Sequence, residues 1–195
     1  MKVGLMGGTF DPIHNGHLMA AQSALESEGL QEVWFMPTNV PPHKPRTQGA
    51  SAEQRWEMVC LAVEGQPGFK PVDVELRKGG VSYSIDTVTQ LRSEYPEHHF
   101  YYIIGADMVG YLPKWYKIEE LARLVTFIGL ERPGYRVNPS ELPDAIRNAV
   151  VAAVMPQMDI SSTEIRNRRQ QGKSIRYWVP DRVQQYIEVN RLYEA

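Results

Sequence analysis

The sequence lacks the features that mark several large classes of protein. It holds one cysteine in 195 residues, so it cannot form an intramolecular disulfide, and this suits a reducing compartment. It has no apolar run of about 18 residues, which a membrane-spanning helix would need. It also lacks the apolar stretch behind basic residues that is typical of a signal peptide. We therefore expect a cytoplasmic protein with no membrane partner.

The sequence also lacks a large excess of basic or of acidic residues. The 21 basic and 23 acidic residues give a net charge of −2, so no overall basic field predicts a nucleic-acid partner. An anionic ligand would need local positive groups instead. Cys60 lies in an apolar run at 58–63, which favours a packed side chain over a catalytic thiol. A chain of 195 residues can bury a core of its own, and we expect residues 1–195 to form a single domain.

Short apolar segments alternate with amphipathic ones along the chain. The apolar segments predict strands at 2–6, 33–36, 70–76, 99–104, 125–130 and 151–155. The amphipathic segments predict helices from 15 or 16 to 28, at 51–63, 84–95, 118–124 and 142–149, after 160, and from 180 towards 190. Because the strands are continuously apolar, both sheet faces should be covered. The sequence predicts an α/β fold with a doubly wound, mostly parallel sheet.

Ligands of such sheets bind beyond the carboxyl ends of the strands, where Gly7 and Gly8 end the first predicted strand. Glycines there let the backbone approach an anion, and the following helix points its free N–H groups at the same place. His14 and His17, on either side of Gly16, fall on one side of the helix start and could both donate to phosphate oxygens. They could also bind a metal, but a third ligand is not evident. The pattern is neither a P-loop nor a dinucleotide-binding fingerprint.

A second candidate anion site lies at 160–166. Ser161, Ser162 and Thr163 are good N-cap residues, so the segment could be a capped helix start and nothing more. Arg166 then falls in the first turn, where a cation opposes the helix dipole and costs stability unless an anion compensates. The residues alone leave the two interpretations open.

Taken together, these motifs resemble the nucleotidyltransferase superfamily that carries a (T/H)-x-G-H signature. The first signature is Gly7-Gly8-Thr9-Phe10-Asp11-Pro12 with His14-Asn15-Gly16-His17, and the second is Ile160-Ser161-Ser162-Thr163-Glu164-Ile165-Arg166. Three further segments resemble the bacterial nicotinate-nucleotide adenylyltransferases in particular: Pro-Pro-His-Lys at 41–44, Ile-Gly-Ala-Asp-Met at 104–108 and Pro-Lys-Trp-Tyr at 113–116. The resemblance runs from residue 4 to residue 193.

The resemblance implies a Rossmann-like fold and transfer of AMP from ATP to nicotinate mononucleotide in NAD biosynthesis. The expected ATP-binding residues are Gly7, Gly8, Thr9, Phe10, His14, Gly16, His17, Gly105, Asp107, Ile160, Ser161, Ser162, Thr163 and Arg166. The expected catalytic residues are His14, His17, Lys44 and Arg166, and the expected acceptor-binding residues are Lys44, Ser84, Trp115 and Tyr116. Mg²⁺ should be bound through the ATP phosphates, and we expect no protein metal ligands.

Several alternatives stay open at this stage. Asp107 could be an ordinary helix N-cap, and Trp115 could be a core residue. Family members carry threonine where this chain has Ser84. The proline-rich segment 38–49 could be an ordered loop or a mobile lid. Rival functions are a phosphopantetheine adenylyltransferase or a cytidylyltransferase, a non-catalytic nucleotide-binding module, and an aminoacyl-tRNA synthetase fragment. The sequence leaves the oligomeric state open, including a homo-oligomer.

Overall fold

The computed structural model describes residues 1–39, 49–81, 83–132 and 134–195. Within these residues, six strands form one sheet, all of them parallel, in the order β3-β2-β1-β4-β5-β6. The strands are β1 (Lys2–Gly8), β2 (Glu32–Pro37), β3 (Phe69–Pro71), β4 (His99–Gly105), β5 (Val125–Glu131) and β6 (Val150–Val154). The predicted α/β class is confirmed, and the sheet is parallel throughout rather than mostly so.

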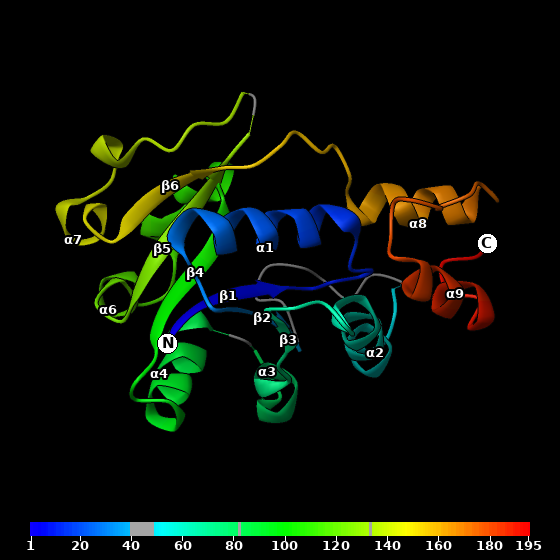
Figure 1. The fold of residues 1–195 in the computed structure, drawn as a ribbon, viewed down its shortest axis with the longest axis horizontal. Helices are drawn as coiled ribbons and strands as arrows, with labels where there is room; N and C mark the ends of the chain where they lie inside the picture. Colours follow the sequence, from blue (N-terminus) through cyan, green and yellow to red (C-terminus); the bar gives the residue numbers. More distant parts are fainter. Residues whose placement is uncertain (40–48, 82, 133) are drawn as a thin grey trace.

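Helices cover both faces of the sheet (Figure 1). One buried apolar cluster joins the sheet to α1 (Asn15–Glu28), α2 (Ala52–Val63), α8 (Ser162–Gln170) and α9 (Asp181–Val189). A second cluster, on the other face, takes in α3 (Val74–Lys78), α4 (Ser84–Glu94), α5 (Ala106–Val109), α6 (Ile118–Ala122) and α7 (Asp144–Arg147). The doubly wound arrangement is therefore confirmed. No helix of the described ranges is long and apolar enough to cross a membrane.

The strand order reverses between β1 and β4. The chain runs outward from β1 through β2 to β3, then returns to β4 beside β1 and runs outward the other way. Their parallel register aligns Leu5 with Tyr102, so Gly7-Gly8 and Gly105 end β1 and β4 at the same edge of the sheet. In such sheets this reversal opens a crevice beyond the strand ends, where ligands bind.

Local sequence signals set several element ends. Ser51 caps α2, because its Oγ accepts a hydrogen bond from the Gln54 N–H at 3.2 Å and the Gln54 Oε1 accepts one from the Ser51 N–H at 2.9 Å. This is the predicted capping box. Gly29 ends α1 with φ 58°, a left-handed conformation that glycine adopts without a Cβ penalty.

The prediction of a strand at 70–76 is wrong beyond Pro71. β3 is a three-residue edge strand, and helix α3 begins at Val74. The last backbone bond to β2 runs from the Val72 N–H to the Phe35 carbonyl at 2.9 Å, and residues 75–78 are Glu, Leu, Arg and Lys, all good helix formers. The helix predicted at 142–149 is likewise shorter, because Pro143 stands directly before α7. Cys60 is half-buried, and burial raises the pKa of its thiol to about 11.

Candidate active site

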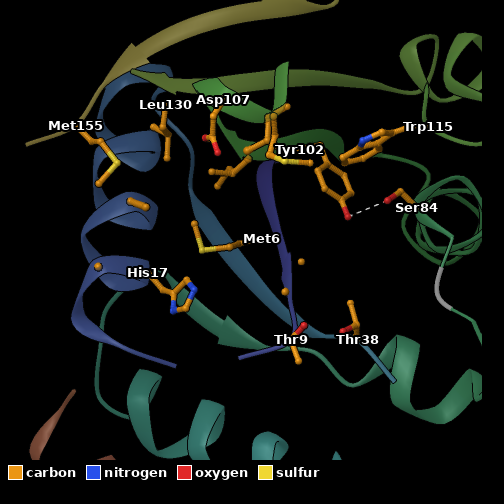
Figure 2. A pocket seen from close by; sticks show the side chains of 18 of the residues that line it. Met6, Thr9, His17, Thr38, Ser84, Tyr102, Asp107, Trp115, Leu130 and Met155 are labelled. Carbon is orange, nitrogen blue, oxygen red and sulfur yellow. Dashed lines mark hydrogen bonds between the residues drawn. The ribbon is translucent and has the colours of Figure 1, made fainter. Parts of the chain in front are cut away.

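A cavity of about 750 Å³ opens at the carboxyl ends of β1, β4 and β5. Figure 2 shows His17 and Met155 on one side of it and Trp115, Tyr102 and Ser84 on the other. The predicted site residues that line it are Gly7, Gly8, Thr9, His14, Gly16, His17, Ser84, Gly105, Asp107, Trp115, Tyr116 and Ile160. The topology thus brings together residues that lie up to about 150 positions apart in the sequence, as expected at a switch point.

The two glycines that end β1 lie close to aromatic side chains. A Cβ at Gly7 would lie 2.9 Å from the Tyr102 hydroxyl, and one at Gly8 would lie 3.1 Å from the Phe10 ring. These glycines therefore make room for protein side chains as well as for any ligand. Phe10 itself is buried beside His17, with ring centroids 5.0 Å apart, and is not among the residues that line the cavity.

His14 and His17 lie against each other at the start of α1. Their rings stack with centroids 3.6 Å apart, and the His14 N–H donates to His17 Nδ1 at 3.2 Å. Because His17 Nδ1 accepts, the proton of the neutral His17 ring sits on Nε2, which becomes a donor. A Cβ at Gly16 would lie 3.0 Å from His14 Nδ1, so glycine leaves room for the His14 ring.

Both imidazoles are uncharged at neutral pH in the protein without ligand. Burial lowers the pKa of His14 from 6.5 to about 4. Burial and, to a smaller extent, the neighbouring His14 lower the pKa of His17 well below 6.5. His14 Nδ1 is also buried without a hydrogen-bond partner in the described part of the chain. A phosphate anion would supply that partner and would favour the charged ring.

The start of α8 supports the loop after β1. Ser161 is the N-cap of α8, with its Oγ accepting from the Glu164 N–H at 3.2 Å. Ser162 Oγ donates to the Pro12 carbonyl at 2.9 Å, and Arg166 Nη1 donates to the Asp11 carbonyl at 2.7 Å. Ser161, Ser162, Thr163 and Arg166 do not line the cavity, whereas Ile160 does. The N-cap interpretation is confirmed, and a phosphate contact of Arg166 stays a prediction.

The carboxyl end of β4 presents an exposed carboxylate to the cavity. Asp107 is the second residue of α5, whose N-cap is Gly105, so the alternative that Asp107 is an N-cap is wrong. A Cβ at Gly105 would lie 2.5 Å from Asp107 Oδ1, so glycine leaves room for this carboxylate. Arg132 Nη2 lies 4.0 Å from the same oxygen. Asp107 is thus free of a capping role and can accept hydrogen bonds from a ligand.

The opposite end of the cavity is aromatic. Trp115 meets Tyr102 edge to face, with centroids 5.7 Å apart, and packs against the second core cluster. It therefore belongs partly to the core and partly to the cavity wall. Ser84 begins α4, and its Oγ lies 3.1 Å from the Tyr102 hydroxyl. Tyr116 is 55% exposed, with its ring centroid 4.9 Å from that of Tyr83.

The sequence reasoning missed part of the wall. Tyr102, Glu75 and Thr38 line the cavity but were not predicted to. Glu75 is 3% exposed and accepts from Thr87 Oγ1 at 3.0 Å. Tyr102 carried a usable signal, because it precedes the strand-ending Gly105 by three residues, close enough to reach the crevice. Glu75 lies inside the segment predicted as a strand, and that wrong prediction gave no indication that Glu75 lines the cavity. Lys44 lies outside the described residues.

Comparison with known proteins identifies the family of this chain. The model of the cytidylyltransferase-like family matches residues 5–168. The chain is 46% identical over 194 residues to the nicotinate-nucleotide adenylyltransferase of Bacillus subtilis, covering 100% of this chain and 99% of the relative. It is 45% identical over 192 residues to a probable enzyme of the same name from Oceanobacillus iheyensis, covering 98% and 96%.

Solved structures show the same fold at lower identity. The nicotinic acid mononucleotide adenylyltransferase of Plasmodium falciparum, solved with NaAD, aligns with a TM-score of 0.79 at 20% identity, over 98% of this chain and 97% of that one. A putative nicotinate-nucleotide adenylyltransferase from Vibrio parahaemolyticus aligns with a TM-score of 0.69 at 21% identity, over 96% and 98%. With its relatives matched from end to end, the chain belongs to the bacterial nicotinate-nucleotide adenylyltransferases, within the cytidylyltransferase-like family.

Proposed function

We propose that residues 1–195 form one catalytic domain that transfers AMP from ATP to nicotinate mononucleotide, giving nicotinate adenine dinucleotide and pyrophosphate. This is a step of NAD biosynthesis, and we propose that it takes place in the cytoplasm. The observation that carries the proposal is one continuous cavity, in a member of this family, that runs from the stacked histidines to an aromatic wall. One end suits phosphates and the other suits a flat ring.

The histidine end fits the phosphates of ATP. The N-terminus of α1, a helix of 14 residues, supplies the positive end of a helix dipole beside His14 and His17. His17 Nε2–H is a fixed donor, and His14 Nδ1 becomes one when the ring is protonated. Lys44 and Arg166 would add positive charge at the phosphates. Asp107 would accept hydrogen bonds from ribose hydroxyls.

The aromatic end fits the acceptor nucleotide. Trp115 would stack on the nicotinate ring, and the flat faces of both rings make such contacts favourable. The first N–H groups of α4, which starts at Ser84, have no acceptors within the helix. Together with backbone near Tyr116 they would receive the ring carboxylate.

The transfer itself needs placement and charge neutralisation. An acceptor phosphate oxygen attacks the α-phosphorus of ATP in line, forming the new P–O bond as the bond to pyrophosphate breaks, with no covalent intermediate. The acceptor phosphate is already ionised near neutral pH, so no general base is needed. His14 and His17 act as donors to charge that develops on the transferred group.

Magnesium would arrive with ATP rather than in a separate protein cage. Among the described residues, no group of three or more His, Cys, Asp or Glu side chains could hold a metal ion. Because His17 Nδ1 accepts from the His14 N–H, the Nε2–H of His17 is a donor that fits a phosphate oxygen. When bound to those phosphates, Mg²⁺ neutralises part of their charge.

A pyrophosphate-release assay with ATP and a panel of acceptors tests the proposal. We expect turnover with nicotinate mononucleotide, and none of comparable rate with phosphopantetheine or with CTP in place of ATP. Faster turnover with phosphopantetheine would replace the proposed acceptor. Absence of turnover with every acceptor, combined with ATP binding, would identify a nucleotide-binding module.

A further inference from the structure

The loop after β1 is held by side chains that come from distant parts of the chain. Three of its carbonyl groups accept such bonds: Thr9 from Arg55 Nη1 at 2.7 Å, Asp11 from Arg166 Nη1 at 2.7 Å, and Pro12 from Ser162 Oγ at 2.9 Å. The donors stand on α2 and α8. The shape of this loop is therefore set by tertiary contacts more than by its own sequence.

The Asp11 side chain is held by the C-terminus. Asp11 Oδ1 accepts from the Tyr193 hydroxyl at 2.6 Å and from the Ala50 N–H at 3.0 Å. A Cβ at Gly49 would collide with the Asp11 carboxylate, so the approach depends on glycine. Tyr193 is the third residue from the end of the chain, 182 positions from its partner.

Arg55 completes the same cluster from α2. It is only 5% exposed, and it donates to the carbonyls of Thr9, Thr38 and Asn39, at 2.7, 2.8 and 3.3 Å. A buried cation is costly unless its donors are satisfied. Because Ala50 directly precedes the N-cap of α2, Asp11 holds the start of the helix that in turn carries Arg55.

This support matters because the loop is strained. Phe10 has φ 50°, in the left-handed region, which costs a non-glycine residue about 1–3 kcal/mol. Such a conformation persists only where the surroundings hold it. Phe10 packs against His17, so a change in the loop would move the histidine pair.

We propose that Tyr193 is a positioning residue for adenylyl transfer: by bonding Asp11, its hydroxyl fixes the 9–14 loop so that His14 and His17 face the transferred phosphate. The catalytic part of this inference rests on the proposed function, whereas the structural part does not. Burial and the neighbouring Asp11 carboxylate raise the pKa of Tyr193, so its hydroxyl keeps the donated proton across the working pH range.

Tyr193→Phe removes only the hydroxyl, and Tyr186→Phe is the matched control. Tyr186 lies on α9, is partly buried against the same core cluster, and its hydroxyl makes no hydrogen bond within the described part of the chain. Two quantities are measured for each variant. The first is kcat and the KM of both substrates, and the second is hydrogen exchange of the 8–14 backbone amides without substrates.

We expect Tyr193→Phe to lower kcat about tenfold, which is the scale of losing one hydrogen bond to a charged group. The KM of the acceptor should stay within about twofold of the wild-type value. Exchange of the 8–14 amides should rise about tenfold. Tyr186→Phe should change neither. In an Asp11→Ala background, Tyr193→Phe should have no further effect on kcat, because the bond is already lost.

The outcomes separate this inference from the proposed function. If the wild type does not use nicotinate mononucleotide, the proposed function fails, while the exchange data still judge the role of Tyr193 in holding the loop. Unchanged exchange and unchanged kcat in Tyr193→Phe would overturn the inference. A lower melting temperature without a change in kcat or in 8–14 exchange would also overturn it, because the bond would then stabilise the fold alone.

Discussion

The two ends of the cavity are built in different ways. At the histidine end, backbone carbonyls and a carboxylate of one loop are bonded by side chains from α2, α8 and the C-terminus. At the aromatic end, which we propose binds the acceptor and call the acceptor end, Ser84, Trp115 and Tyr116 are placed by ring contacts and one hydroxyl pair, and Tyr116 is 55% exposed.

This difference matches the chemistry that each end would perform. Stabilising charge in a transition state requires donors that do not have to reorganise. A loop held by hydrogen bonds from several other elements provides such donors. Holding a flat ring requires area and stacking, which tolerate small movements. We therefore expect changes at the histidine end to act on kcat and changes at the acceptor end to act on KM.

The largest expected effect is at the histidine end. His17→Ala should lower kcat about a hundredfold to a thousandfold, the scale for losing one transition-state donor. The acceptor KM should change little, since His17 stands on the far side of the cavity from Trp115 (Figure 2). Steady-state kinetics with both substrates varied measure this.

His99→Ala is the control for that variant, since His99 is an exposed histidine at the start of β4. It should turn over like the wild type. Near-normal kcat in His17→Ala would remove this residue from the mechanism and would erase the contrast between the two ends.

A smaller effect is expected at the acceptor end. Trp115→Ala should raise the acceptor KM about tenfold to a hundredfold, because stacking of a base on an aromatic ring is worth about 1–3 kcal/mol. The KM of ATP should stay near its wild-type value. Trp56→Ala, on α2, is the control for loss of a partly buried tryptophan. A fall in kcat with an unchanged acceptor KM would contradict the division of roles.

The smallest effect is the dependence of stability on pH. Between about pH 4 and 6.5, the unfolded chain carries a proton on His14 that the folded chain does not, so stability falls as pH falls. The slope from this residue is at most about 1.4 kcal/mol per pH unit. The free energy of unfolding, measured with denaturant between pH 7 and pH 5, should depend less steeply on pH in His14→Ala than in the wild type. Bound ATP should also reduce this pH dependence of the wild type, since a phosphate favours the charged form of the His14 ring. An identical slope in wild type and His14→Ala would mean that His14 titrates normally in the folded protein.

Most of the fold could be predicted from the sequence because its signals are local. Residues close together in the sequence are enough to predict the continuous apolar strands, the Ser51 capping box and the helix end at the left-handed Gly29. The prediction was wrong where local preferences compete. The 70–76 segment has strand-like apolar residues, but the helix formers at its end belong to α3, which begins at Val74.

The candidate site was predictable only in part. The histidines and Ser84 stand at element starts that the sequence marks, and the cavity includes them. The bonds from Tyr193 to Asp11 and from Arg55 to Thr9 join positions 182 and 46 apart. No local pattern indicates such contacts, because they depend on how the strand ends and the C-terminus meet in space.

The most direct test of the account is the ratio of kcat/KM for nicotinate mononucleotide over nicotinamide mononucleotide. Backbone N–H groups at the start of α4 can satisfy a carboxylate, but they leave the N–H groups of an amide unpaired, which costs about 1–3 kcal/mol per group. We predict a preference for the nicotinate form of at least about tenfold, kept in Ser84→Ala because the backbone donors remain. Equal use of the two acceptors by the wild type would contradict the proposed acceptor site, and a preference lost in Ser84→Ala would assign the selectivity to the hydroxyl.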